Sequence, residues 1–337
     1  MNVDTRSIDE AVSKGVFTGV IAVDVGDQRT LERCEGFLHR ALRVPLSAHT
    51  RIAIASGSKA FTALAVMRLV EDGRLRLDQP VRTLLDGDLP LIAGGVTVEH
   101  LLTHTSGMGD YLDEDAGWEV SDHVLTLPVH TLTTSEAFLP MLDGHPQQFA
   151  PGERFEYCNG GYMVLAVLLE RVTGQNYHDA VQQLVFQPAG LEETAFLPLN
   201  DLPADAAPGY VFDEGNLVNT LHLPVLGNGD GGAFTTASDL HRFWLAFLEG
   251  RIVSRETAAE MVRPRHEVPA EQMRYGMGFW IHKKHPALIL EGYDAGASFR
   301  STHIPGSRTT VSVLGNSSEG AWPVISALAQ MIDAELA

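Results

Sequence analysis

Apolar and polar positions alternate with two different periods along this chain of 337 residues, and each period predicts a different kind of element. Near the N-terminus, residues 19–25 and 30–37 are short runs of strand type, and Gly26-Asp27 between them predicts a hairpin turn. Residues 56–72 carry apolar side chains at helical spacing, and Gly73 predicts where that helix ends.

The rest of the chain divides into a helical middle and a strand-rich end. From about residue 77 to residue 228, helical patterns alternate with loops rich in Gly, Pro and Asp. Strand-type runs return at residues 275–281, 287–290, 298–304 and 309–314, and a last amphipathic helix follows them. We therefore expect an α/β fold: an antiparallel sheet flanked by helices, with an inserted all-helical subdomain. Residues 1–76 and 235–337 would form the sheet subdomain, and residues 77–234 the mainly helical insertion.

Composition narrows the classes of function. The formal net charge is −19, so phosphate backbones and anionic membranes would repel this surface, and we expect neither nucleic acid nor membrane as a partner. The two cysteines, Cys34 and Cys158, make no disulfide framework in a chain of this length. The polar start has no apolar stretch of signal-peptide type, so the chain is expected to be cytoplasmic.

The sharpest local feature is Ser56-Gly57-Ser58-Lys59. A Ser and a Lys three positions apart at the start of a helix lie on the same face, so the amine can reach the hydroxyl. A serine becomes a nucleophile when a neighbouring base takes its proton. The pattern occurs often by chance, and taken alone it more commonly marks a capping serine followed by a solvated lysine. The apolar runs on both sides favour burial of Ser56 and Lys59 together.

A second feature is Tyr157-Cys158-Asn159, which precedes the helix expected at residues 162–172. Tyr157 and Asn159 project to the same side of an extended loop. A tyrosine beside a lysine can relay protons, and an asparagine offers a carbonyl to the lysine and an amide to a substrate. The plainer interpretation is a capping Asn with a packed Tyr. Cys158 is more simply a packed thiol than a reactive one.

Taken together, these motifs resemble a known family, the serine β-lactamases and penicillin-binding proteins, especially the class C branch and its esterase relatives. The resemblance covers nearly the whole chain. Besides the two motifs above it includes Leu77-Asp78-Gln79-Pro80-Val81, residues 98–107, residues 149–152, Gly231-Gly232-Ala233 and Tyr275-Gly276-Met277-Gly278. The resemblance implies Ser56 as nucleophile, with Lys59 and Tyr157 as its activating partners.

The family's third motif has a cationic or polar residue, any residue, and then Gly, on a strand that lines the site. The best ungapped match here is Leu290-Glu291-Gly292, and Asp294-Ala295-Gly296 is an alternative that fits the residues after it less well. On either match the usual Lys or His is absent. The resemblance implies that the backbone N–H groups of Ser56 and Tyr293 form the oxyanion hole, a role that needs no particular side chain. His282-Lys283-Lys284-His285 lies upstream and could supply a cation instead, although such a run is usually a solvated turn.

The function implied is two-step acyl transfer on a small ester, amide or lactam, without metal or organic cofactor. The missing cation favours an ester or amide that carries no essential carboxylate. A β-lactamase or D-amino-acid peptidase is the alternative enzyme, and a non-catalytic relative that binds ligands or scaffolds an assembly is the alternative of another class. His100 and His104 stand at a spacing that can bind metal, but no third ligand is evident and the segment is expected to be structural.

Overall fold

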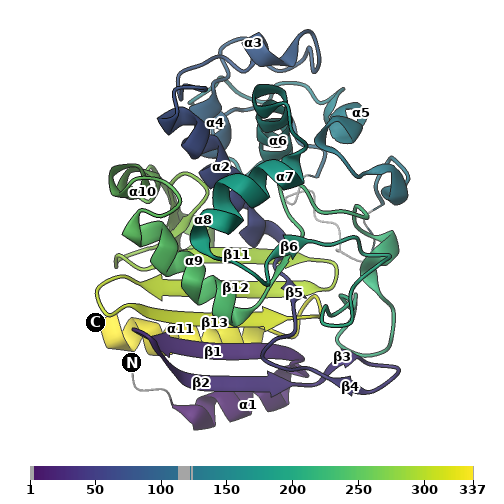
Figure 1. Cartoon of the computed structure of the whole chain (residues 1–337), viewed down its shortest axis with the longest axis vertical. Coiled ribbons are helices and arrows are strands. Elements are labelled where there is room, and N and C mark those ends of the chain that lie inside the picture. The colour runs from purple at the N-terminus through teal and green to yellow at the C-terminus, as the bar shows by residue number, and fades with distance from the viewer. Residues whose placement is uncertain (1–3, 113–121, 123, 337) are drawn as a thin grey trace.

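The largest sheet of the described structure is antiparallel, and its strands come from both ends of the chain (Figure 1). The computed structural model describes residues 4–112, 122 and 124–336. In this described part the sheet has eight strands in the order β2-β1-β13-β12-β11-β10-β9-β8. They are β1 (Gly19–Val25), β2 (Gln28–Glu35), β8 (His266–Val268), β9 (Met273–Tyr275), β10 (Trp280–His282), β11 (Leu288–Asp294), β12 (Ala297–Ile304) and β13 (Thr309–Gly315).

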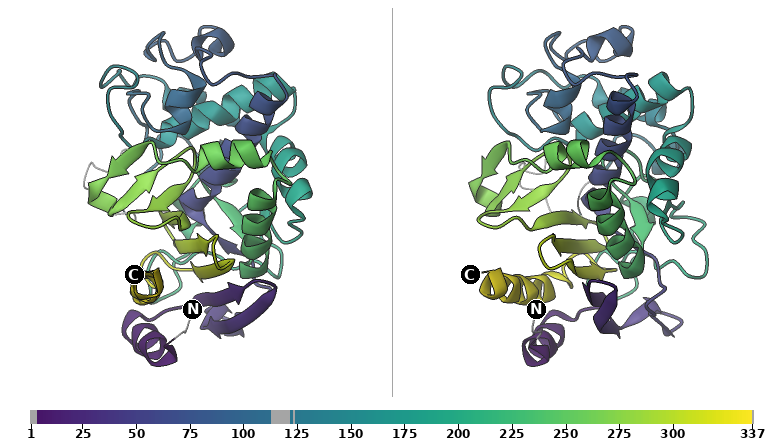
Figure 2. Two further views of the ribbon diagram at one scale, coloured as in Figure 1. Left: turned by 90° about the vertical axis from the view of Figure 1, so that its left-hand side faces the viewer. Right: turned by 60° about the vertical axis from the view of Figure 1, so that its left-hand side comes forward.

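Alternating side chains of these strands divide the sheet into two buried faces. Ile21 and Val23 of β1 pack with the two terminal helices, α1 (Thr5–Gly15) and α11 (Trp322–Leu336). Val20 and Ala22 face the other side, where they join the main hydrophobic core. Figure 2 shows the terminal helices together on one side of the sheet and the remaining helices on the other.

The main core lies between the sheet and two helices that are buried along almost their whole length. These are α2 (Lys59–Glu71) and α6 (Asn159–Thr173), which pack against each other. The other helices and turns are α3 (Arg82–Leu85), α4 (Val98–Leu102), η3 (Val129–Thr131), η4 (Ser135–Phe138), α5 (Leu139–Leu142), α7 (Tyr177–Val181), η5 (Gln182–Phe186), α8 (Gln187–Ala189), η6 (Asn219–Leu221), α9 (Ala237–Glu249), α10 (Arg255–Met261) and η7 (Pro269–Glu271). Every residue of α6 from Asn159 to Leu169 is buried, so this part of the helix has no face toward solvent.

A small second sheet carries the chain from the large sheet toward Ser56. Its order is β5-β7-β6, and a separate hairpin pairs β3 with β4. The strands are β3 (Phe37–His39), β4 (Val44–Pro45), β5 (Ile52–Ala53), β6 (Ala195–Phe196) and β7 (Ala233–Thr235). Since β5 ends at Ala53, its position in this sheet determines where the next turn begins.

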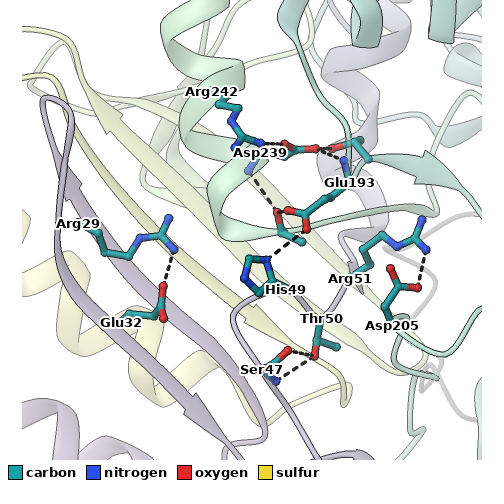
Figure 3. Close-up of polar contacts among 12 residues, drawn as sticks. Arg29, Glu32, Ser47, His49, Thr50, Arg51, Glu193, Asp205, Asp239 and Arg242 are labelled. Carbon is teal, nitrogen blue, oxygen red and sulfur yellow. Dashed lines mark hydrogen bonds and ion pairs between the residues drawn. The ribbon is translucent and has the colours of Figure 1, made fainter.

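A polar network anchors this second sheet to the start of α9 (Figure 3). The fully buried Asp239 carboxylate accepts from Glu193 N and Thr194 Oγ1, each at 2.8 Å, and pairs with Arg242 at 2.7 Å. Thr236 Oγ1 in turn donates to Glu193 at 3.0 Å. Because the buried carboxylate has a partner for each oxygen, it costs little to bury and it fixes β6 against α9.

The fold class predicted from the sequence is confirmed. The errors of the sequence prediction concern the bounds of single elements. Residues 275–281 were expected to be one strand, but they form β9 and β10 with a turn between them, in which Gly278 has φ of +81°. The helix expected from Ser56 begins at Lys59, because Ala55–Ser58 form the 3-10 turn η1. None of the described helices has the length and apolarity that crossing a bilayer requires.

Candidate active site

Ser56 lies in a tight turn that joins β5 to α2. Ala55 adopts a left-handed backbone, with φ of +45°, which a residue bearing a Cβ rarely does. Ser58 braces the turn, since its Oγ donates to Ala55 O at 2.8 Å and accepts from Ala233 N at 2.9 Å. Backbone strain held by buried hydrogen bonds is common where a side chain must be presented to a substrate. Ser56 itself remains partly exposed.

The Lys59 amine is surrounded by acceptors. Its Nζ lies 2.9 Å from Ser56 Oγ, 2.8 Å from Asn159 Oδ1 and 2.7 Å from the Asp230 carbonyl oxygen. Lys59 is only 2% exposed, so these three contacts satisfy all three protons of an ammonium group. Removal of one proton would leave an amine that still donates to two acceptors and can accept from the Ser56 hydroxyl.

Tyr157 is placed by ring contacts. Its ring lies 4.9 Å from Lys59 Nζ, 4.4 Å from the His104 ring and 6.0 Å from the Trp280 ring, to which it is nearly parallel. Aromatic contacts of this kind hold a ring in one plane. Tyr157 therefore lies beside Lys59, with the ammonium group over its ring.

Beneath Tyr157 a chain of buried hydrogen bonds determines which ring nitrogen of His104 carries the proton. His104 Nδ1 accepts from Cys158 N at 3.0 Å, so the ring proton belongs on Nε2, which lies 3.1 Å from Tyr275 Oη. Tyr275 lies 3.3 Å from Tyr162 Oη, which donates to Leu102 O at 3.0 Å. Burial lowers the pKa of His104 well below its usual range, and the nearby Lys59 cation adds to this effect. The imidazole is thus neutral.

The start of α6 presents Asn159 to Lys59. The Asp110 carboxylate accepts from the backbone N–H groups of Asn159 and Gly160, which caps the helix. Asn159 Nδ2 donates to Leu112 O at 3.1 Å, so its Oδ1 faces the lysine. Burial raises the pKa of Asp110 to about 6, although the helix N–H groups oppose the shift.

Strand β11 passes directly beside the Ser56 turn. A Cβ added to Gly292 would lie 2.1 Å from Ile54 O and 2.9 Å from Ser56 N, so only glycine permits this approach. Leu290 is buried at 2% exposure and Tyr293 is 38% exposed. The Glu291 carboxylate forms an ion pair with Arg300, which stands opposite it on β12.

Two cavities meet at Ser56 and Tyr293. The larger, of about 1240 Å³, is an open cleft whose wall includes Tyr157, Trp280 and Glu291. The smaller, of about 240 Å³, has leucine side chains together with Tyr111 and Asp230, and the Tyr111 hydroxyl donates to the Asp230 carboxylate. Ser56 is thus reached from two cavities.

Most of the residues singled out in the sequence come together at this point. Ser56, Lys59, Tyr157 and the third-motif residues Leu290 and Glu291 line one narrow recess, and Asn159 contacts Lys59. The cluster His282–His285 is elsewhere: His282 bonds to Asp333 of α11 at 2.9 Å, and Lys283 donates to Gln272. The ring nitrogens of His104 and Nδ1 of His100 are engaged in hydrogen bonds within the protein.

Sequence reasoning did not find the roles of four residues at the site. Asp110 and Asp230 support Asn159 and Lys59 from segments without a distinctive pattern, and Asp230 takes part through its backbone carbonyl. Ser58 was given no role, although it braces the turn. The Cys158 thiol caps α6 by accepting from Gly161 N at 3.3 Å, and burial raises its pKa well above the ordinary value.

Comparison with known proteins identifies the family of this chain. The family model described as Beta-lactamase matches residues 5–335. This chain belongs to the Beta-lactamase family. Penicillin-binding protein 4* of Bacillus subtilis (strain 168) is 30% identical to it over 288 residues, which are 81% of this chain and 61% of that protein. Esterase EstB of Burkholderia gladioli is 36% identical over 199 residues, which are 56% of this chain and 50% of the esterase.

A solved structure of a related protein resembles this chain over almost its whole length. The penicillin-binding protein from Bacillus halodurans superposes with a TM-score of 0.88 at 35% identity, over 96% of this chain and 99% of that one. The chain spans about three-fifths of Penicillin-binding protein 4* and half of Esterase EstB. Membership of the family therefore rests on the part these proteins share.

Proposed function

We propose that this chain is a serine hydrolase that cleaves small esters or amides through an acyl-enzyme on Ser56. The observation that carries the proposal is the 2.9 Å contact between Lys59 Nζ and Ser56 Oγ inside a buried, fully bonded network. A lysine held this way lies within reach of the serine proton, which is the geometric requirement for a general base.

Proton transfer in the proposed reaction involves Lys59 and Tyr157. Ser56 Oγ attacks the substrate carbonyl as its proton passes to this pair, and the same pair returns a proton to the leaving group. Water then attacks the acyl-enzyme and releases Ser56. The position of the Tyr157 ring, 4.9 Å from Lys59 Nζ, supports a shared proton path.

The oxyanion would be stabilised by backbone N–H groups of Ser56 and Tyr293. The support is the close approach of Gly292 to Ser56 N, which brings the start of the next peptide unit beside the nucleophile. A donor aimed at the developing charge contributes about 10²- to 10³-fold to the rate. The same close approach supports Leu290-Glu291-Gly292 as the third motif.

The preferred substrates are neutral. Leu290 offers no cation, and the described cleft residues include the carboxylates of Asp110, Glu156, Glu271, Glu291 and Glu319. An anionic substrate would enter against this field. A β-lactamase or D-amino-acid peptidase remains the alternative enzyme, and a non-catalytic binding role is the alternative outside enzymes.

One preparation tests all three functions. Turnover of p-nitrophenyl esters, nitrocefin and D-amino-acid amides is compared, with labelling of Ser56 by a fluorophosphonate. We expect neutral short-chain esters to be cleaved with the highest kcat/KM, and Ser56→Ala to lose at least about a thousandfold of the rate. Preference for nitrocefin or the amides would favour the alternative enzymes, and an unlabelled Ser56 would favour the binding role.

A further inference from the structure

Arg300 occupies an unusual place on the wall of the large cleft. Among the described residues that line this cleft, it is the only arginine or lysine, and five acidic residues accompany it. A guanidinium in such a cleft would normally be the group that receives a substrate carboxylate or phosphate.

Here the guanidinium already has a carboxylate partner. Glu291 and Arg300 stand directly opposite each other on the antiparallel strands β11 and β12. Arg300 Nε and Nη2 both contact the same oxygen, Glu291 Oε2. The Glu291 side chain is only 15% exposed and the Arg300 side chain 23%, so solvent screens this pair less than an ion pair on the open surface.

The pair also lies close to the reacting atoms. Glu291 precedes Gly292, whose Cα approaches Ser56 N so closely that an added Cβ would lie 2.9 Å from it. Glu291 also lines the narrow recess that contains Ser56, Lys59 and Tyr157. A substrate bonded to Ser56 therefore extends along the wall that carries the pair.

We infer that Glu291 is a specificity-determining residue, because it neutralises Arg300 and so excludes substrates that carry a carboxylate near the scissile bond. The inference rests on the proposed function and adds to it the substrate charge that this site selects. In the wild-type protein an anion either meets a guanidinium whose charge Glu291 already neutralises, or has to displace Glu291 and leave that largely buried carboxylate without a partner. Such a penalty rejects the wrong ligand without any contact that favours the right one.

The experiment uses two matched substrate pairs on the full chain. One pair places the charge on the acyl side, mono-4-nitrophenyl glutarate against 4-nitrophenyl valerate. The other places it on the leaving group, 4-acetoxybenzoate against its methyl ester. The measured quantity is the ratio of kcat/KM for the anionic member to kcat/KM for the neutral member.

Glu291→Gln should raise this ratio about tenfold in at least one pair, because Arg300 is released and a charge-assisted hydrogen bond becomes available. Glu291→Gln with Arg300→Gln should return the ratio to the wild-type value. The matched control is Glu271→Gln, which removes a carboxylate from the same cleft but leaves Arg300 paired, and it should raise the ratio by about twofold or less.

Two results would overturn the inference. One is an unchanged ratio in Glu291→Gln for both substrate pairs. The other is an equal rise in Glu271→Gln or in the double variant, which would show that the general field, and not the freed Arg300, is responsible. Absence of wild-type turnover on both neutral esters would instead reject the proposed ester hydrolysis, so the two failures are distinguishable.

Discussion

The two walls beside Ser56 differ in what their side chains do. The helical wall, formed by η1, α2, the start of α6 and the loop that carries Asp230, surrounds Lys59 with three neutral acceptors, all buried or half-buried. The strand wall, formed by β11 and β12, has one position where the fold tolerates only glycine, Gly292, and side chains such as Glu291 that face the cleft. The helical wall is therefore suited to proton transfer, and the strand wall to stabilising an oxyanion and to choosing among substrates.

The largest expected effects come from breaking the helical wall. Lys59→Ala and Tyr157→Phe should each lower kcat by about a thousandfold, and the double variant should be little worse than the poorer single one. Residues that act as one unit are non-additive in this way. The measurement is kcat of all three variants on one neutral ester, with unfolding followed by circular dichroism as the control for folding. Losses that multiply would show that the two residues do not share a proton path.

This difference between the walls also explains what the sequence could predict. Ser56, Lys59 and Asn159 are recognisable because their chemistry requires particular side chains at particular spacings, and the structure places them in contact. Asp230 contributes a backbone carbonyl, which any residue could supply, so no sequence pattern marks it. The register of Leu290-Glu291-Gly292 remained ambiguous for the same reason.

The large-scale fold was predictable because short apolar runs bounded by turn residues mark the strands of a sheet that is buried on both faces, as in β1 and β13. Strand β1 was predicted with the bounds that it has, Gly19–Val25. The turn between β9 and β10 was missed since the residues around Gly278 are as apolar as the strands they join. The short turn η1 was missed because its strain at Ala55 is imposed by tertiary contacts, among them those of Ser58.

The strand wall is tested next by Gly292→Ala. The added Cβ would lie 2.1 Å from Ile54 O, so β11 has to move away from the Ser56 turn and carry the Tyr293 N–H with it. Loss of one oxyanion donor costs about a hundredfold in kcat. Gly306→Ala is the control, because a Cβ there meets no atom within 4 Å, and its kcat should equal the wild-type value. A Gly292→Ala protein with normal kcat would mean that β11 does not form the oxyanion hole.

A smaller effect is expected from the support beneath Tyr157. His104→Phe keeps a ring against Tyr157 but leaves the buried N–H of Cys158 without its acceptor. An unsatisfied buried donor costs about 1–3 kcal/mol, more than the ring contact preserves. We expect that loss in the free energy of unfolding and about a tenfold lower kcat.

His104→Asn separates the hydrogen bond from the ring. The asparagine carbonyl restores an acceptor near the position of Nδ1, so it should recover part of the kcat that His104→Phe loses. The comparison is made by urea unfolding and by kcat on the same ester. If phenylalanine were tolerated better than asparagine, ring stacking and not the Cys158 hydrogen bond would be the contact that positions Tyr157.

The smallest effect should be a change in pH dependence from Asp110, which caps α6 at the edge of the cleft. Its folded pKa of about 6 lies above the ordinary value of 3.8, so the folded state binds the proton more tightly than the unfolded state does. Stability from this group is therefore present at low pH and lost as the pH rises through about 6. Between pH 5 and pH 7.5 the loss should be on the order of 1 kcal/mol. Asp110→Asn cannot titrate, so its free energy of unfolding, measured in urea at both pH values, should fall less than that of the wild type. Equal falls in the two proteins would show that the helix N–H groups offset the cost of burial and keep the Asp110 carboxylate ionised.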